Sequence, residues 1–168
     1  MKAEMQLTSA QFNDGEFIAM EHVLAEKYGF GCNGGNQSPQ LAWSGAPEGT
    51  RSFALTCFDP DAPTGSGFWH WVVANIPASV TSLELDAGSP ASGRMPAGAV
   101  TVRNDVGTRE YIGPCPPRGD HPHRYYFTIF AVGAEALSVN ADTTPAVVGF
   151  QLHFNTLARA ELVGLFKH

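Results

Sequence analysis

The chain has 168 residues and a net charge of −6, and only 15% of its residues are charged, whereas glycine and proline occur 18 and 12 times. This length and composition predict one loop-rich globular domain over residues 1–168 with a well-filled core. The ten lysines and arginines are scattered along the chain, which excludes nucleic acid as an expected partner because nucleic-acid binding depends on concentrated positive charge.

The chain up to residue 132 is expected to contain one helical segment followed by several strands. Residues 16–28 have a helix-forming composition. Residues 51–58 place apolar side chains at alternating positions on both sides, which predicts a strand buried on both faces. Residues 69–76 and 124–132 are rich in aromatic and β-branched side chains and are expected to be central strands. Residues 99–106 are expected to form a further strand. Turns rich in glycine and proline separate these segments.

The C-terminal third carries the clearest helix signals, over residues 143–158. Thr144 suits the N-cap, and Pro145 suits the first helical position. Apolar side chains then recur at steps of three and four residues and form one apolar face, made of Val147, Phe150, Phe154 and Leu157. Residues 160–166 are expected to close the sheet as a strand. These elements predict a mainly β, mostly antiparallel fold with a few peripheral helices.

Two carboxylates follow the first of the central strands, in the sequence DPDAP at residues 59–63. The two prolines fix φ and remove backbone donors, so the chain must turn out of the sheet there. Asp59 and Asp61 lie two positions apart, and a turn can point them in different directions. Either both carboxylates cap backbone N–H groups of the turn, or one of them belongs to a binding site.

A histidine interrupts the apolar sequence GFWHWVV at position 70. On such a strand a histidine is more often a hydrogen-bonded core residue than a ligand-binding group. The later sequence YIGPCPPRGDHPHRYYF favours ligand binding, because its glycines and prolines form a rigid loop that lets backbone approach a ligand closely. This loop leads to His123 and Tyr125, which can point to the same face of the next strand, while His121 falls in the loop.

Two enzymatic interpretations have less support. Asp59, His70 and His123 would make a set of two histidines and one carboxylate for a metal, but no metal-ligand signature accompanies them. No G-x-S-x-G motif occurs, and Cys115 lies between two prolines without an assigned base. We therefore expect no metal, no cofactor and no enzymatic activity.

The termini and cysteines bear on location. The N-terminus lacks the apolar region of a secretory signal, and no stretch approaches the ~20 apolar residues of a membrane span, so stable membrane insertion is not expected. Cys32, Cys57 and Cys115 are far apart and fit no metal spacing. An odd number of cysteines without a signal is typical of the reducing cytoplasm. We therefore expect a cytoplasmic protein whose three cysteines are small buried hydrophobes or bystanders.

The segments CFDPDAPTGSGFWHWVV and GPCPPRGDHPHRYYFTIFA resemble the two signature regions of the phosphatidylethanolamine-binding protein (PEBP) family, and more closely those of its bacterial Raf kinase inhibitor-like branch. Similarity extends to residues 36–55 and 148–164 and so covers nearly the whole chain. The resemblance implies a PEBP-like fold, with a central antiparallel sheet, a second smaller sheet and short peripheral helices. It also implies an anion pocket at one end of the central sheet.

The resemblance also implies which residues form this pocket. The ligand-binding set is Asp59, Phe68, His70, Pro116, His123 and Tyr125, supported from behind by Asp61 and Pro63. Asp59 would orient a histidine and favour its protonated form, whereas Asp61 would tie down the turn. The Ala62–Pro63 bond is implied to be cis, and Cys115 stands where eukaryotic relatives have glycine.

The sequence departs from the eukaryotic members of the family in two ways, which limits how far their pocket and function can be assigned to this chain. The short sequence TGSG at 64–67 replaces a longer segment that supplies a further tyrosine, and the C-terminal helix that covers the pocket is not expected. The expected function is binding of a phosphate-type anionic group, such as a phosphorylethanolamine-like molecule or a phosphorylated side chain, in a regulatory protein. The alternatives are a protein-interaction module that inhibits a kinase or protease, and an unrecognised enzyme that uses the Asp/His cluster. A homodimer is expected from the bacterial branch and from the apolar C-terminal segment.

Overall fold

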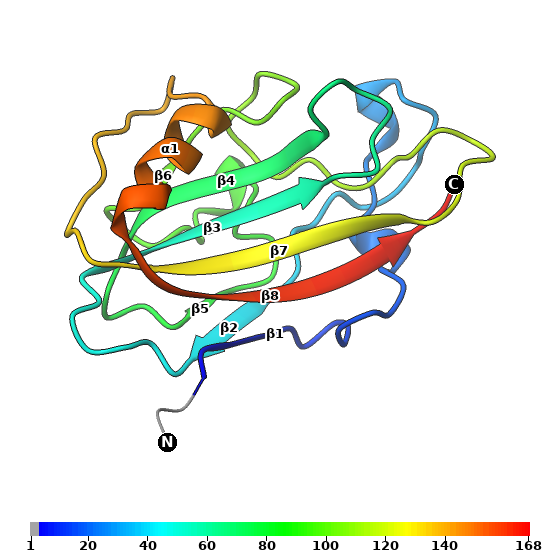
Figure 1. The fold of residues 1–168 in the computed structure, drawn as a ribbon. Helices are drawn as coiled ribbons and strands as arrows, with labels where there is room; N and C mark the ends of the chain where they lie inside the picture. Colours follow the sequence, from blue (N-terminus) through cyan, green and yellow to red (C-terminus); the bar gives the residue numbers. More distant parts are fainter. Residues whose placement is uncertain (1–3) are drawn as a thin grey trace.

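Two antiparallel sheets form the body of the molecule in the computed structural model, which describes residues 4–168 (Figure 1). The larger sheet has the order β6-β4-β3-β7-β8 and consists of β3 (Ser52–Asp59), β4 (Phe68–Pro77), β6 (Val100–Thr101), β7 (His123–Val132) and β8 (Thr156–Phe166). The smaller sheet has the order β1-β2-β5 and consists of β1 (Gln6–Thr8), β2 (Leu41–Ser44) and β5 (Ser82–Leu83). The predicted mainly β fold with a second, smaller sheet is confirmed.

The main core lies between the two sheets. Leu55 and Trp71 of the larger sheet are fully buried and share one apolar cluster with Leu41 of the smaller sheet. A second cluster covers the other face of the larger sheet, where Val148 and Leu152 belong to the helix α1 (Pro145–Asn155). Because both faces of β3 and β4 are covered, these strands are apolar almost throughout, and the polar residues at their ends need a separate explanation.

The helix α1 begins as predicted, but it presents its most apolar face to solvent. The side chain of Thr144 accepts a hydrogen bond from the N–H of Val147, and Pro145 occupies the first turn. The side chains that the sequence places on one apolar face remain 47–69% exposed; they are Val147, Phe150, Phe154 and, already in β8, Leu157. The rings of Phe150 and Phe154 pack edge to face. The periodicity correctly predicts that the first three of these side chains share one face of the helix, but it does not predict that this face points to solvent.

The segment at 16–28 is not the predicted helix. It forms two 3-10 turns, η1 (Met20–His22) and η2 (Glu26–Tyr28), separated by extended residues. Backbone hydrogen bonds to distant segments hold it open, since the N–H of Ile18 donates to the carbonyl of Leu165 and the N–H of Leu24 donates to that of Pro114. Tertiary hydrogen bonds thus replace the local ones of a helix.

The expected strand at 99–106 is also shorter, because only Val100–Thr101 pairs with β4. The side chain of Asn104 accepts hydrogen bonds from the N–H groups of Val106, Gly107 and Thr108 and closes a turn there. A third 3-10 turn, η3, covers Pro90–Ser92.

Three neighbouring strands, β3, β4 and β7, have polar residues at the same end of the larger sheet. Asp59 is the last residue of β3, and it pairs with Phe68, the first residue of β4. His123 is the first residue of β7, the other neighbour of β3. The helix α1 lies at the opposite end of these strands (Figure 1). No helix within residues 4–168 has the length and apolar character to cross a bilayer.

Candidate functional site

The turn after β3 is held by its own polar groups. One carboxylate oxygen of Asp59 accepts a hydrogen bond from the N–H of Asp61 at 2.8 Å, and the N–H of Thr64 donates to the carbonyl of Ala62 at 2.7 Å. The second bond closes a γ-turn around Pro63, whose fixed φ suits it in the trans form. No cis peptide bond occurs among the described residues, so the expected cis bond at Ala62–Pro63 is wrong.

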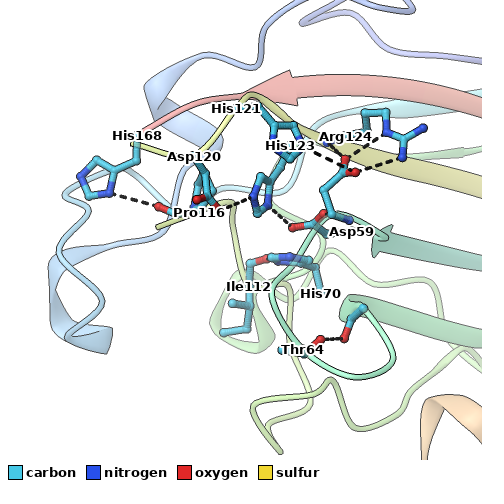
Figure 2. A network of polar contacts seen from close by, with 12 residues as sticks. Asp59, Thr64, His70, Ile112, Pro116, Asp120, His121, His123, Arg124 and His168 are labelled. Carbon is cyan, nitrogen blue, oxygen red and sulfur yellow. Dashed lines mark hydrogen bonds and ion pairs between the residues drawn. The ribbon is translucent and has the colours of Figure 1, made fainter. Parts of the chain in front are cut away.

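The buried centre of the site is His123, which lies between two carboxylates (Figure 2). Its Nδ1 atom is 2.8 Å from a carboxylate oxygen of Asp59, and its Nε2 atom is 3.0 Å from one of Asp120. The side chains of His123 and Asp59 are 1% and 4% exposed, whereas that of Asp120 is 38% exposed. With an acceptor at each ring nitrogen, the imidazolium form, which has two N–H donors, fits this geometry best.

Electrostatics agrees with this assignment. Burial by itself disfavours the charged form of His123, but the hydrogen bonds and charges of Asp59 and Asp120 outweigh burial and raise the pKa of His123 above its ordinary value. The raised pKa and the acceptor at each ring nitrogen both favour the positively charged form of His123. Asp59 takes the orienting position that the sequence analysis assigned to it.

His70 is in a different protonation state. Its Nδ1 atom lies 2.7 Å from the carbonyl oxygen of Ile112 and must donate its hydrogen there, because a carbonyl only accepts. Burial lowers the pKa of His70 below its ordinary value, against the favourable charges of Asp59 and Asp105. His70 is thus neutral near pH 7, and its Nε2 atom carries a lone pair without a hydrogen-bond partner in residues 4–168.

A cavity of about 190 Å³ brings most of the predicted site residues together. It is lined by Asp59, Pro63, Phe68, His70, Pro116, His123 and Tyr125, together with walls that include Leu24, Phe30, Ile112 and Pro117. The rings of Phe68 and Tyr125 each pack edge-on against that of His70. The walls are mostly apolar, and the polar groups meet at the ends of β3, β4 and β7.

Asp61 does not line this cavity. It binds Arg124 on the opposite face of β7, with oxygen atoms 3.0 Å from both Nε and Nη2 of the guanidinium and 2.9 Å from the backbone N–H. The hydrogen bonds from Arg124 lower the pKa of Asp61 to about 2. Asp61 therefore ties the turn to β7. His121 is exposed and lies 3.8 Å from the same carboxylate, outside the cavity lining.

A disulfide holds the proline loop that forms one wall of the cavity. Cys32 and Cys115 are bonded, with Cα atoms 5.9 Å apart and a sequence separation of 83 residues. The expectation that all three cysteines are small buried hydrophobes or bystanders is therefore wrong for Cys32 and Cys115, while Cys57 is free and buried. The loop is also tied to the N-terminal segment by a hydrogen bond from the N–H of Gly113 to the side chain of Asn36 at 2.8 Å.

Two polar partners of the site were not predicted from the sequence. Asp120 contacts His123, and the carbonyl of Ile112 orients His70. The only available signal for Asp120 was its position three residues before His123, at the end of the glycine- and proline-rich loop. A backbone carbonyl has no sequence signal, because every residue carries one.

The metal alternative can be compared with these positions. Asp59, His70 and His123 do not form a group of three whose ligand atoms all lie within 4.8 Å of one another in the described part of the chain. Within residues 4–168 the one compact group of three is Cys32, Cys115 and His168, and there the two sulfur atoms are bonded to each other. Neither set offers the free, convergent donors that zinc or iron sites use.

Comparisons with known proteins agree with the fold and the motifs. The profile of the family described as "Phosphatidylethanolamine-binding protein" matches residues 8–167. YbcL of Escherichia coli is 49% identical over 165 residues, which cover 98% of this chain and 88% of that protein. YbhB of the same organism is 44% identical over 163 residues, which cover 97% of this chain and 100% of that protein.

Solved structures give the same result. The crystal structure of YbcL, described as a new member of the mammalian PEBP family, superposes with a TM-score of 0.94 over 99% of both chains. A putative PEBP homologue from Chlamydia trachomatis, 30% identical, superposes with a TM-score of 0.80 over 98% of both chains. The matches extend over the whole fold and include the strands that carry the candidate site.

Proposed function

Since the chain belongs to the phosphatidylethanolamine-binding protein family, we propose that it binds a phosphate-type anion in the cavity between His70 and His123. This proposal rests on two polar side-chain atoms that lack a hydrogen-bond partner. The Nε2 atom of His70 and the hydroxyl of Tyr125 have no hydrogen-bond partner in the described part of the chain, and neither belongs to the fully buried atoms without a partner. Both residues line the cavity.

The chemistry of these groups suits an anion with several oxygen atoms. The Tyr125 hydroxyl can donate one hydrogen bond, and protonated His70 can donate a second through Nε2. Burial raises the pKa of Tyr125, so this hydroxyl keeps its hydrogen. The positive charge of His123 lies on the same cavity wall. Phe68 and Pro116 exclude water around these groups, which strengthens charge-assisted hydrogen bonds.

We propose binding, not catalysis, as the role of this site. Asp59 is engaged by His123 and by the N–H of Asp61, so its two oxygen atoms serve to orient other groups. No cysteine or serine lies beside a free base in the cavity lining described for residues 4–168. A bound phosphorylated group would make the protein a sensor or regulator, either of a small molecule or of a kinase or protease partner.

A second role, self-association, is favoured by the exposed face of α1. Phe150 and Phe154 are 67% and 69% exposed and adjacent to each other, and contiguous apolar surface of this kind marks interaction sites. A homodimer would cover it. The helix α1 lies at the end of the sheet opposite to the end of β3 and the start of β7, so anion binding and dimerisation can be tested separately (Figure 1).

The disulfide also bears on location. Disulfides persist mainly in oxidising compartments. The Cys32–Cys115 bond therefore removes the support that the cysteines gave to a cytoplasmic location, and we propose that the protein folds where this bond can form.

Calorimetric titration with sulfate tests the proposed anion site. Sulfate is a suitable probe because its charge does not change between pH 5 and 8, unlike that of phosphate. We expect binding at pH 5.5 and a loss of at least about tenfold in affinity for His70→Ala. His153→Ala on α1, at the other end of the molecule, is the matched control and is expected to bind normally. Absence of sulfate binding to the unmodified protein at any pH would contradict the proposal.

Crystals soaked with phosphate and with phosphorylethanolamine would then identify the ligand group. Density for the phosphate oxygens beside His70 and Tyr125 is expected in both soaks. Ordered density for the amine only in the second soak would indicate a phosphorylethanolamine-like ligand. Capture of a partner that depends on His70 would instead favour a phosphorylated side chain.

A further inference from the structure

One carboxylate of the site comes from a loop and not from the sheet. Asp59 is fixed as the last residue of β3, and its side chain is almost fully buried. Asp120 lies after the proline loop, and its side chain is 38% exposed and bonded to Nε2 of His123 at 3.0 Å. It follows Gly119, which has a φ of +88°, a conformation that favours glycine. The backbone N–H of Asp120 donates only to the nearby carbonyl of Pro117.

These contacts allow Asp120 to leave without disturbing the sheet. Its carboxylate accepts from no group other than His123 in residues 4–168. Its turn is local, within residues 117–120. By contrast, removing Asp59 would break both the turn after β3 and the bond to Nδ1 of His123.

The charges around the cavity make the position of Asp120 significant. The positive charge of His123 faces the negative charges of Asp59 and Asp120, while Asp61 is paired with Arg124. With His70 neutral, this leaves an excess of one negative charge around His123. A dianion that enters the cavity therefore meets a repulsive charge, and the second N–H of His123 is already engaged.

We propose that Asp120 is a built-in competitor of the anion: its carboxylate occupies Nε2 of His123 until an oxygen of the ligand displaces it. This inference rests on the proposed function. Displacement removes the excess negative charge and frees a charge-assisted donor in the same step. His123 itself lines the cavity, so an oxygen of a ligand bound there can approach its ring from the cavity.

The exchange also determines which ligands can bind. A carboxylate ligand carries the same single charge as Asp120 and must also lose its freedom of motion, so it gains little by the exchange. A dianionic tetrahedral oxyanion brings one more negative charge to His123 and protonated His70. Asp120 thus makes the site selective for phosphate- and sulfate-type dianions over carboxylates.

The test compares sulfate and acetate binding to the unmodified protein, Asp120→Asn and Asp120→Ala at pH 5.5. We expect Asp120→Ala to bind sulfate about tenfold more tightly, and Asp120→Asn to lie between the two, because an amide oxygen still accepts from Nε2 but carries no charge. Acetate is expected to bind measurably only to Asp120→Ala, where it fills the vacated carboxylate position. Glu48→Gln removes one carboxylate in the turn before β3, at the other end of that strand, and controls for net charge.

A second measurement separates competition from a merely structural role. Side-chain NMR of His123 should show a lower pKa in Asp120→Ala than in the unmodified protein, because one of its two carboxylates is gone. Equal or weaker sulfate binding by a folded Asp120→Ala protein would overturn this inference and leave the proposed function intact. If neither the unmodified protein nor the variants bind sulfate, both fail. If Asp120→Ala does not fold, Asp120→Asn decides by the same comparison.

Discussion

The two ends of the larger sheet depart from the usual rules of folding in opposite ways. At the end where β3 stops and β7 starts, the charged groups of Asp59 and His123 are buried. At the other end, Phe150 and Phe154 of α1 are left in water. One end of the sheet thus buries charged side chains, which are normally exposed, and the other end exposes aromatic side chains, which are normally buried.

The two ends show how a protein tolerates buried charge and exposed apolar surface. Buried charge is acceptable only when it is paired and hydrogen-bonded, and His123 has an acceptor at both ring nitrogens. Exposed apolar surface needs no partner for the chain to fold, but a partner lowers its free energy. The buried charges of the polar end are thus paired within one chain, whereas α1 presents a face that a second molecule can cover.

The largest expected effect concerns the Cys32–Cys115 disulfide, which holds one wall of the cavity at the polar end. Cys32→Ser should lower the free energy of unfolding by about 4 kcal/mol, because the disulfide restricts a loop of the unfolded chain between residues 83 positions apart. Urea unfolding measures it. A reducing agent should produce the same loss in the unmodified protein and no further loss in Cys32→Ser. Equal stability with and without reductant would contradict the prediction.

The next effect concerns α1. The protein is expected to be a homodimer by light scattering, and the double change Phe150→Glu and Phe154→Glu should weaken association by about a hundredfold, because it places charge in the covered apolar face. The unfolding free energy of the monomer should hardly change, since both side chains are exposed in it. Met20→Gln alters an exposed apolar residue in η1 and serves as the control. A monomer mass for the unmodified protein at high micromolar concentration would refute the homodimer.

A smaller effect is the pH dependence of sulfate binding at the polar end. Burial lowers the pKa of His70, and sulfate favours its protonated form, so affinity should rise as the pH falls. His123 contributes less to this change, because Asp59 and Asp120 raise its pKa above the ordinary value. We expect binding at pH 5.5 to be tighter than at pH 8 by at least about tenfold, or ~1.4 kcal/mol.

Asp59 provides the variant that sharpens this measurement. Asp59→Asn should move the midpoint to lower pH, because the charge of Asp59 supports the protonated form of His70. Calorimetry that shows pH-independent sulfate binding would refute the role given to His70.

The smallest effect separates the two aspartates of the turn. Asp61→Asn should lower the unfolding free energy by about 1 kcal/mol at pH 7, because it weakens the hydrogen-bonded pair with Arg124. The pKa of Asp61 is lowered to about 2, so this stabilisation is present above its ordinary value and disappears as the pH falls towards 2. Urea unfolding at pH 7 and at pH 2.5 should therefore give a smaller difference at the lower pH. Sulfate binding should be unaffected, and its loss would show that Asp61 belongs to the site.

The elements that could be predicted from the sequence are those whose signals are local. The strands β3, β4 and β7 have side chains that suit burial on both faces, and Thr144 and Pro145 mark the start of α1. Residues 16–28 were predicted wrongly because hydrogen bonds to Pro114 and Leu165, remote in sequence, replace those of a helix.

The candidate site was predictable to the extent that strand alternation determines it. His123 and Tyr125 share a buried face while Arg124 points away, as a period of two requires. The pairing of Cys32 with Cys115 and the contact between Asp120 and His123 depend on how loops meet in space, and no spacing signals them. Family resemblance supplied the assignment of the pocket residues, which the residue pattern alone left open.

The Cys32–Cys115 bond also divides the chain topologically. It closes a covalent ring that contains β2 to β6, while β1, β7, α1 and β8 lie outside it. A single protease cut inside the ring, for example in the turn at 64–67, would therefore leave one molecule of nearly unchanged mass until a reductant separates the two pieces. A cut after residue 115 would release two pieces with or without reductant. Comparing the electrophoretic mobility of a nicked sample with and without reductant thus shows whether the cut lies inside or outside the disulfide-closed ring.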